Sequence, residues 1–162
     1  MAIITLNNNS LSSVTSLPAG VGGKVLQVVT AIDEDERSTS STSYVTASNT
    51  LSVNITPSAT SSKIYVISTF SGGNTSTANI SFYTIFRDST NLGSASNGMA
   101  VVRADTNGTM GLIPTSVSVL DSPNTTSSIT YQIYTKADSG TTARINNANN
   151  VQGSITAFEI GA

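Results

Sequence analysis

Residues 62–70, SKIYVISTF, decide the fold class of this chain, because they join β-branched and aromatic residues in a pattern with a period of two. In an extended strand, successive side chains point to opposite faces. The first face carries Ile64, Val66, Ser68 and Phe70, and the second carries Tyr65, Ile67 and Thr69. The pattern predicts a strand that is buried on one side and partly covered on the other.

A second segment of the same kind follows a turn-like stretch, SGGNTSTA at residues 71–78. Residues 79–88, NISFYTIFRD, place Ile80, Phe82, Thr84 and Phe86 on one face, with Tyr83 and Ile85 on the other. Eight further segments have a strand pattern: residues 24–32, 42–47, 50–55, 98–104, 115–121, 128–137, 142–146 and 154–160. The segments between them are rich in Gly, Asn, Asp, Pro and Ser, which favour turns.

These segments predict an all-β domain, an antiparallel two-sheet β-sandwich or jelly roll of about ten strands. No window of the sequence has a sustained helical period, and the chain shows neither an internal repeat nor a linker between two domains. We expect residues 24–162 to form this single domain.

The first 23 residues differ from the rest, because they lack a sustained strand pattern and end in Gly22 and Gly23. They are nevertheless too apolar for a plain solvated tail; the apolar residues are Ile3, Ile4, Leu6, Leu11, Val14 and Leu17. One interpretation is an extended arm that docks on a neighbouring subunit or a larger assembly. The other is a first edge strand and a loop packed on their own domain. The stretch has none of the three parts of a secretory signal, so we expect it to belong to the working protein.

Composition narrows the function. Ser, Thr and Asn number 27, 24 and 15 of the 162 residues, whereas charged residues make up 10% and the net charge is −2. The chain has no His and no Cys, so it cannot build Ser-His-Asp, Cys-His or zinc-hydrolase chemistry. The seven basic residues are scattered, which argues against nucleic-acid binding. No apolar run is long enough to insert into a membrane, and we expect no cofactor.

The only charge cluster is AIDEDERS, residues 31–38, where four acidic residues precede Arg37: Asp33, Glu34, Asp35 and Glu36. Carboxylates on a loop are ligands for hard cations such as calcium. The cluster lacks the spacing of an EF-hand loop, and alternate side chains at the end of a strand point apart. A solvated loop and a weak cation site are therefore the two interpretations, and the first is favoured.

Other polar and aromatic residues have structural interpretations beside functional ones. The remaining carboxylates considered for acid–base chemistry are Asp88, Asp105, Asp121, Asp138 and Glu159. Most lie in turn-like contexts, where Asp commonly binds its own backbone, and we expect Glu159 to pair with an arginine or face solvent. The nine Tyr and Phe residues lie in strand patterns, so core or intersubunit packing is expected and a sugar-stacking platform is the alternative.

Five stretches carry a resemblance: the opening residues 1–31, STSSTSYV at 38–45, LSVNITPSATSSKIYVIS at 51–68, SVSVLDSPNTTSSITYQIYTKA at 116–137 and SITAFEIGA at 154–162. Together they resemble a family of small virion structural proteins of tailed bacteriophages, especially phages of aquatic bacteria. The resemblance implies a β-sandwich protein on the particle surface, of the decoration, fibre or knob type. It supplies no receptor-binding motif.

Three functions follow. The first is a capsid decoration or head-fibre protein, a homotrimer docked through residues 1–23, in contact with other virion proteins and made in the host bacterial cytoplasm. The second is a tail fibre or receptor-binding knob that recognises a host-surface glycan. The third is a polysaccharide depolymerase. Only about 23 residues precede the sandwich, too few for a fibre shaft at roughly 3.3 Å per residue, which favours the first.

Overall fold

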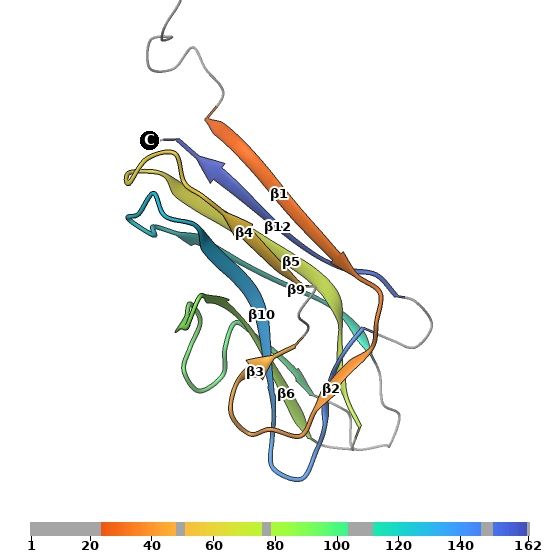
Figure 1. Ribbon diagram of the computed structural model, residues 1–162. Coiled ribbons are helices and arrows are strands. Elements are labelled where there is room, and N and C mark those ends of the chain that lie inside the picture. Colours follow the sequence, from red (N-terminus) through yellow and green to blue (C-terminus); the bar gives the residue numbers. More distant parts are fainter. Residues whose placement is uncertain (1–23, 48–50, 76–78, 104–111, 147–150, 162) are drawn as a thin grey trace, which may run out of the picture.

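The computed structural model describes residues 24–47, 51–75, 79–103, 112–146 and 151–161, and these ranges form two antiparallel β-sheets packed face to face (Figure 1). They contain twelve strands and no helix. Accordingly, no helix in these ranges has the length and apolar character needed to cross a membrane. The all-β, two-sheet prediction is confirmed.

Sheet A is built around the long strand β5 (Lys63–Asn74). On one edge of β5 lie β12 (Gly153–Ile160) and, further along, β11 (Ala143–Ile145); on the other edge lies β9 (Ile113–Asp121). Beyond β12 comes β1 (Val25–Asp33), and beyond β11 comes β2 (Arg37–Thr39). Strand β1 therefore forms an outer edge of the described sheet.

Sheet B is built around the antiparallel pair β6 (Ile80–Arg87) and β10 (Ile129–Ala137). The outer edge of β10 takes β4 (Ser52–Ile55) and β3 (Val45–Thr46). The outer edge of β6 takes β8 (Ala100–Arg103) and β7 (Thr90–Asn91). Consecutive strands from β8 to β11 alternate between the two sheets.

The core lies between the sheets and is built by the alternation of buried and half-exposed residues. In β10 every second residue is buried, from Ile129 to Ala137, and in β5 the buried series begins with Ile64, Val66 and Ser68. The rings of Phe70 and Tyr83 meet across the core at 5.1 Å between centroids. The fully enclosed apolar side chains include Leu51, Ile64, Val66, Ile85, Ile133, Ile145 and Ile155.

All ten predicted strand segments contain a strand, and the faces predicted for β5 and β6 are confirmed. Two strands were not predicted, β2 and β7, because they are only three and two residues long. Strand β9 begins two residues earlier than expected and includes Pro114, which a strand at the edge of the described sheet tolerates. The expected arm lies outside the described residues, so the division into 1–23 and 24–162 stays a prediction.

Candidate functional sites

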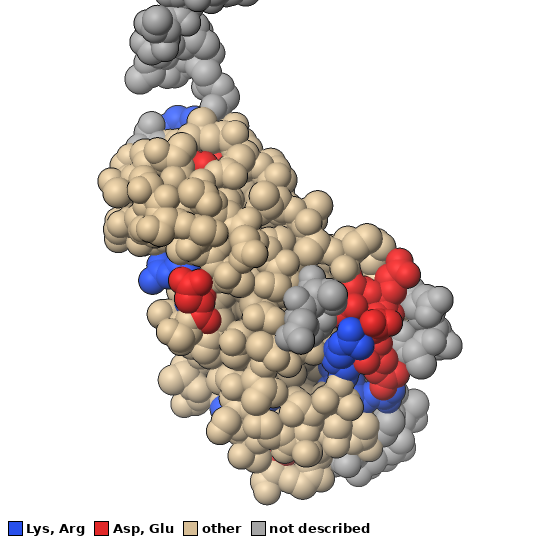
Figure 2. Space-filling view, in the orientation of Figure 1, with Lys and Arg blue, Asp and Glu red and all other residues tan. Residues whose placement is uncertain are grey.

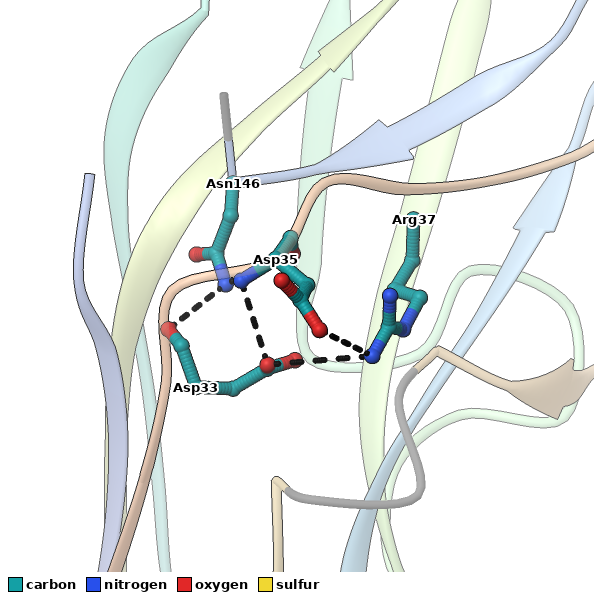
Figure 3. Close-up of polar contacts among 4 residues, drawn as sticks. All are labelled: Asp33, Asp35, Arg37 and Asn146. Carbon is teal, nitrogen blue, oxygen red and sulfur yellow. Dashed lines mark hydrogen bonds and ion pairs between the residues drawn. The ribbon is translucent and has the colours of Figure 1, made fainter. Parts of the chain in front are cut away.

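The acidic segment forms the end of β1 and the turn into β2, where the carboxylates of Asp33 and Asp35 face Arg37 (Figure 3). The Arg37 guanidinium lies 2.9 Å from Asp35 Oδ2 and 3.9 Å from Asp33 Oδ1. The backbone N–H of Asp35 also donates to Asp33 Oδ1 at 3.2 Å. In Figure 2 the largest group of mixed charges lies on this side of the molecule, beside the end of β1.

Asn146, which directly follows β11, holds this turn. Its buried side-chain amide donates to the carbonyls of Asp33 at 2.9 Å and Asp35 at 3.4 Å (Figure 3). Its φ of 56° lies in the left-handed region, which Asn adopts more readily than most residues. Glycine is also required at position 153, because a Cβ there would lie 2.7 Å from Asn146 Oδ1.

The other two acidic residues also have protein partners. Glu36 forms an ion pair with Arg144, whose Nε donates at 2.8 Å, and Glu34 accepts from Gln152 at 3.2 Å. Within the described part of the chain, no group of three or more His, Cys, Asp or Glu side chains is placed to hold a metal ion. The weak cation site at Asp33–Glu36 stays a prediction, and the geometry shows a turn closed by arginine.

Glu159 is the most unusual ionisable residue, because its side chain is buried in β12 without an arginine. One carboxylate oxygen accepts from the backbone N–H of Ser58 at 2.7 Å and from the hydroxyls of Ser58 at 2.5 Å and Ser62 at 2.7 Å. The other accepts from Gln27 at 2.6 Å. The expectation that Glu159 pairs with an arginine or faces solvent is therefore wrong.

The charge state of Glu159 follows from these donors. Burial by itself raises the pKa of a carboxyl, but the hydrogen bonds from Ser58, Gln27 and Ser62 outweigh it and lower the pKa of Glu159 to about 2. The residue is a carboxylate at neutral pH that ties β12 to β1 and to the segment between β4 and β5. It is thus suited to holding strands together and unsuited to giving up or taking a proton near pH 7.

Asp121 joins the two sheets. From the end of β9 it lies 2.8 Å from Arg87 of β6 and accepts from the hydroxyl of Tyr131 of β10 at 2.6 Å. Burial and the Asp121 carboxylate raise the pKa of Tyr131, so the phenol stays protonated and donates. Asp121 was expected to bind its own turn, and that expectation is wrong. The turn role applies to Asp138, which accepts from the backbone N–H of Ser139 at 2.9 Å. Asp88 instead accepts from the backbone N–H of Thr130 in β10 at 3.0 Å, and Asp105 lies outside the described residues.

An aromatic cluster covers part of the outer face of sheet B. Phe86 and Tyr134 stack with centroids 3.9 Å apart, and Tyr44 lies 6.1 Å from Phe86. The Lys136 ammonium lies 4.8 Å from the ring centroids of both Tyr44 and Phe82. The members are half-buried, so part of each ring and part of the Lys136 side chain are exposed to solvent.

The other aromatic residues of sheet B are structural. Tyr83 is fully buried, and its hydroxyl accepts from the N–H of Gly73 at 2.8 Å and lies 2.5 Å from the Arg144 carbonyl. Burial raises the pKa of Tyr83 to about 12. Tyr83 and Tyr131 therefore confirm the core interpretation, whereas the cluster around Tyr134 leaves the sugar platform open.

The outer face of sheet A carries an apolar row that crosses four strands. The pairing registers place Val28 opposite Phe158, Phe158 opposite Tyr65, and Tyr65 opposite Leu120. These four residues are called the sheet A row below. Val28 and Leu120 are 52% and 54% exposed, and the Phe158 and Tyr65 rings lie 6.2 Å apart. Periodicity alone gave no signal of this row, because it requires the register between strands.

The described strands form an antiparallel β-sandwich. No protein-family model matches the chain. The search of curated proteins gives no match either. Solved structures similar to it include the VP2 protein of infectious bursal disease virus as a mutant in T=1 particles, with a TM-score of 0.37 and 17% identity over 84% of this chain and 36% of that one.

Two further similar structures are the Gt strain of the same virus, at a TM-score of 0.37 and 17% identity, and a VP2 subviral particle, at 0.36 and 16%. Both alignments cover 84% of this chain, with 38% and 37% of the viral chains. The chain thus spans little more than a third of these proteins. A likeness at this level carries no conclusion about function.

Proposed function

We propose that this protein is a non-enzymatic structural protein of a tailed-bacteriophage particle, exposed on the particle surface as a capsid decoration or head-fibre protein. In this proposal it is a homotrimer, and residues 1–23 are an assembly arm that binds a neighbouring virion subunit. The resemblance of residues 1–31 and 116–137 to phage virion proteins supports it. The β-sandwich that this resemblance implies is the fold of the described residues.

The observation that carries the structural role is the placement of the carboxylates. Asp121 ties two sheets together, Glu159 ties strands of sheet A to a loop, and Asp33 and Asp35 close a turn with Arg37. A glycosidase needs two carboxyl groups that face a shared substrate space. This placement favours a particle component over the polysaccharide depolymerase.

Labelling of intact particles with an antibody against residues 24–162, counted by electron microscopy, tests the proposal. Many labels distributed over the head are expected for a decoration protein. Labels confined to the tail tip would contradict the decoration role, and unlabelled particles would contradict any surface role. Deletion of residues 2–17 is expected to lower the number of copies bound to each particle. Circular dichroism of the deletion variant should show that residues 24–162 remain folded.

The aromatic cluster favours a second candidate, a fibre knob that binds a host-surface glycan. Aromatic rings stack on sugar rings, and a neighbouring ammonium group donates hydrogen bonds to the sugar hydroxyls. If so, excess full-length protein blocks phage adsorption, and Tyr134→Ala weakens this competition while Ile113→Ala, at a residue of β9 that is 48% exposed and outside the sheet A row, does not. Equal competition by both variants, or none by the wild type, would exclude glycan binding at this cluster.

A further inference from the structure

We propose that the outer face of sheet A beside β1 is the docking surface for residues 1–23 of a second copy of this chain. The inference rests on the proposed function, in which the same segment is an assembly arm, and it names both the partner and the surface that the arm binds. Four observations carry it: an exposed apolar row, a bare strand edge, the chemistry of the segment and its length.

The surface is apolar and nearly uncharged. The sheet A row continues toward the start of β1 through Leu26, which is 52% exposed, and Ile160, which lies opposite Val25. Lys63 is the only charged side chain that β1, β12, β5 and β9 turn outward in the described part of sheet A. Contiguous exposed apolar surface of this kind marks interaction sites on soluble proteins.

The edge beside this surface is open to another strand. Strand β1 pairs only with β12 among the described strands, so its second edge presents backbone N–H and C=O groups. Edge strands are commonly protected by charged residues, by proline or by being short. Strand β1 is nine residues long and has neither charge nor proline from Val25 to Ile32. A further strand that paired with β1 would form hydrogen bonds with these backbone groups and extend sheet A.

The N-terminal segment has the matching chemistry. Residues 1–23 carry no charged side chain, and Ala2, Ile4 and Leu6 alternate with Ile3 and Thr5 in a strand pattern. Laid beside β1, such a strand puts one set of apolar residues next to Val28 without burying a charge, which would cost free energy. An arm that binds a charged surface would be expected to carry complementary charges.

The length of the segment indicates that the partner is another copy. A hairpin onto its own β1 would most commonly use a connection of two to five residues. Here the strand-like residues 2–6 are separated from Lys24 by the seventeen residues 7–23. When extended, these seventeen residues are longer than the nine-residue β1, which spans about 30 Å, so they can reach a neighbouring sheet. A contact between two different surfaces forms a ring when the rotation between subunits closes, and a trimer is such a ring.

Cross-linking of mixed variants tests the docking directly, because the natural chain has no cysteine. Full-length Leu6→Cys protein, labelled with nitrogen-15, is refolded with unlabelled Val28→Cys protein and treated with a short bis-maleimide. We expect a covalent pair of one labelled and one unlabelled chain, identified by mass spectrometry. Val101→Cys, at a residue 50% exposed on sheet B, replaces Val28→Cys as the matched control and is expected to give at least tenfold less product.

A second measurement follows assembly without cross-linking. Analytical ultracentrifugation of the full chain is expected to show trimers, and Val28→Glu should weaken association by about tenfold or more because it buries a charge at the contact. Val101→Glu should leave association unchanged. Both variants should keep the wild-type circular dichroism, since both side chains are about half exposed.

Several results would overturn the inference. These are a purely monomeric full chain at tens of micromolar, equal effects of Val28→Glu and Val101→Glu, or cross-links found only within one chain of a Leu6→Cys/Val28→Cys double variant. The proposed function is tested separately, because particles that the antibody does not bind would contradict it whatever the oligomeric state. If the antibody binds the particles but no cross-link forms between the arm and sheet A, the virion role is retained and this docking surface is rejected.

Discussion

Glu159 illustrates how single residues stabilise this fold through groups far away in sequence. Its carboxylate has four donors from three residues, two of which lie 97 and 101 positions earlier. A buried charge is tolerated only when such donors replace water. Replacing one carboxylate oxygen by an amide nitrogen therefore leaves donors at this site facing a group that cannot accept.

We predict that Glu159→Gln lowers the free energy of unfolding by about 2–3 kcal/mol at pH 7, because an amide replaces an acceptor that binds four donors. Urea denaturation measures the change. Glu34→Gln, at an exposed residue, is the matched control and should change stability by less than about 0.5 kcal/mol. Equal effects of the two variants would contradict the role given to Glu159.

The same residue predicts an acid sensitivity. The pKa of Glu159 falls from 4.5 to about 2 on folding, so its contribution is fully present above about pH 4.5 and is lost as the pH falls toward 2. Unfolding free energies measured from pH 6 down to pH 2 should decline less steeply for Glu159→Gln than for the wild type. Parallel profiles would show that Glu159 does not titrate in this range.

Tyr131→Phe is predicted to cost about 1–2 kcal/mol, since it removes one donor from the partly buried Asp121 carboxylate and keeps the ring in the core. Thermal unfolding compares it with Tyr65→Phe, whose half-exposed hydroxyl lies on the outer face of sheet A. If both variants melt at the wild-type temperature, the hydrogen bond between the sheets contributes nothing measurable.

These partners could not be predicted from the sequence. Composition excluded His and Cys chemistry, and the turn context correctly predicted the local backbone contact of Asp138. The partners of Asp121 and Glu159 depend on which strands pack across the core, and a period of two carries no such information. Residue types were therefore informative where the contact is local and uninformative where it is distant.

At the level of elements, β5 shows why some positions in a regular strand are restricted. Gly72 faces the core where β9 and β6 approach, and a Cβ there would lie 2.8 Å from Thr115 Oγ1 and 3.0 Å from the Tyr83 ring. Tyr83 has little freedom to move, because its hydroxyl is bound to Gly73 and Arg144. The glycine lets the ring fill this part of the core.

We predict that Gly72→Ala destabilises the protein by about 1–3 kcal/mol through overpacking, although alanine is otherwise acceptable in a strand. Chemical denaturation gives the change, with Ser116→Ala on the exposed face of β9 as the control. A neutral Gly72→Ala would mean that Tyr83 shifts without penalty, in contrast to its fixed hydrogen bonds.

The strands themselves were largely predictable, because each long one presents one face to the core and one to solvent. Strands β5, β10 and β12 repeat that alternation over eight residues or more. The short strands β2 and β7 have too few residues to show a period, and they form because β11 and β6 offer them an edge. The sheet A row also escapes prediction, since it appears only when four registers are combined.

At the level of the whole molecule, three arginines are the cations of the ion pairs among the described residues: Arg37, Arg87 and Arg144. Because Asp33, Asp35 and Glu36 already contact arginines, we predict that neither EDTA nor added calcium changes the melting temperature. Differential scanning calorimetry measures this. A drop of several degrees in EDTA that calcium restores would instead establish the cation site considered for the acidic segment.

The position of β12 has a consequence for the synthesis of the chain. This strand, close to the C-terminal end, lies between β1 and β5 and pairs with both. Sheet A cannot join its first strand to the rest until residues 153–160 have emerged from the ribosome. Folding of sheet A therefore waits for β12 and is expected to be slow, as for other proteins dominated by distant contacts. During that interval the edges of β1 and β5 are unpaired, and a low-charge, hydroxyl-rich chain must avoid pairing with its own nascent copies.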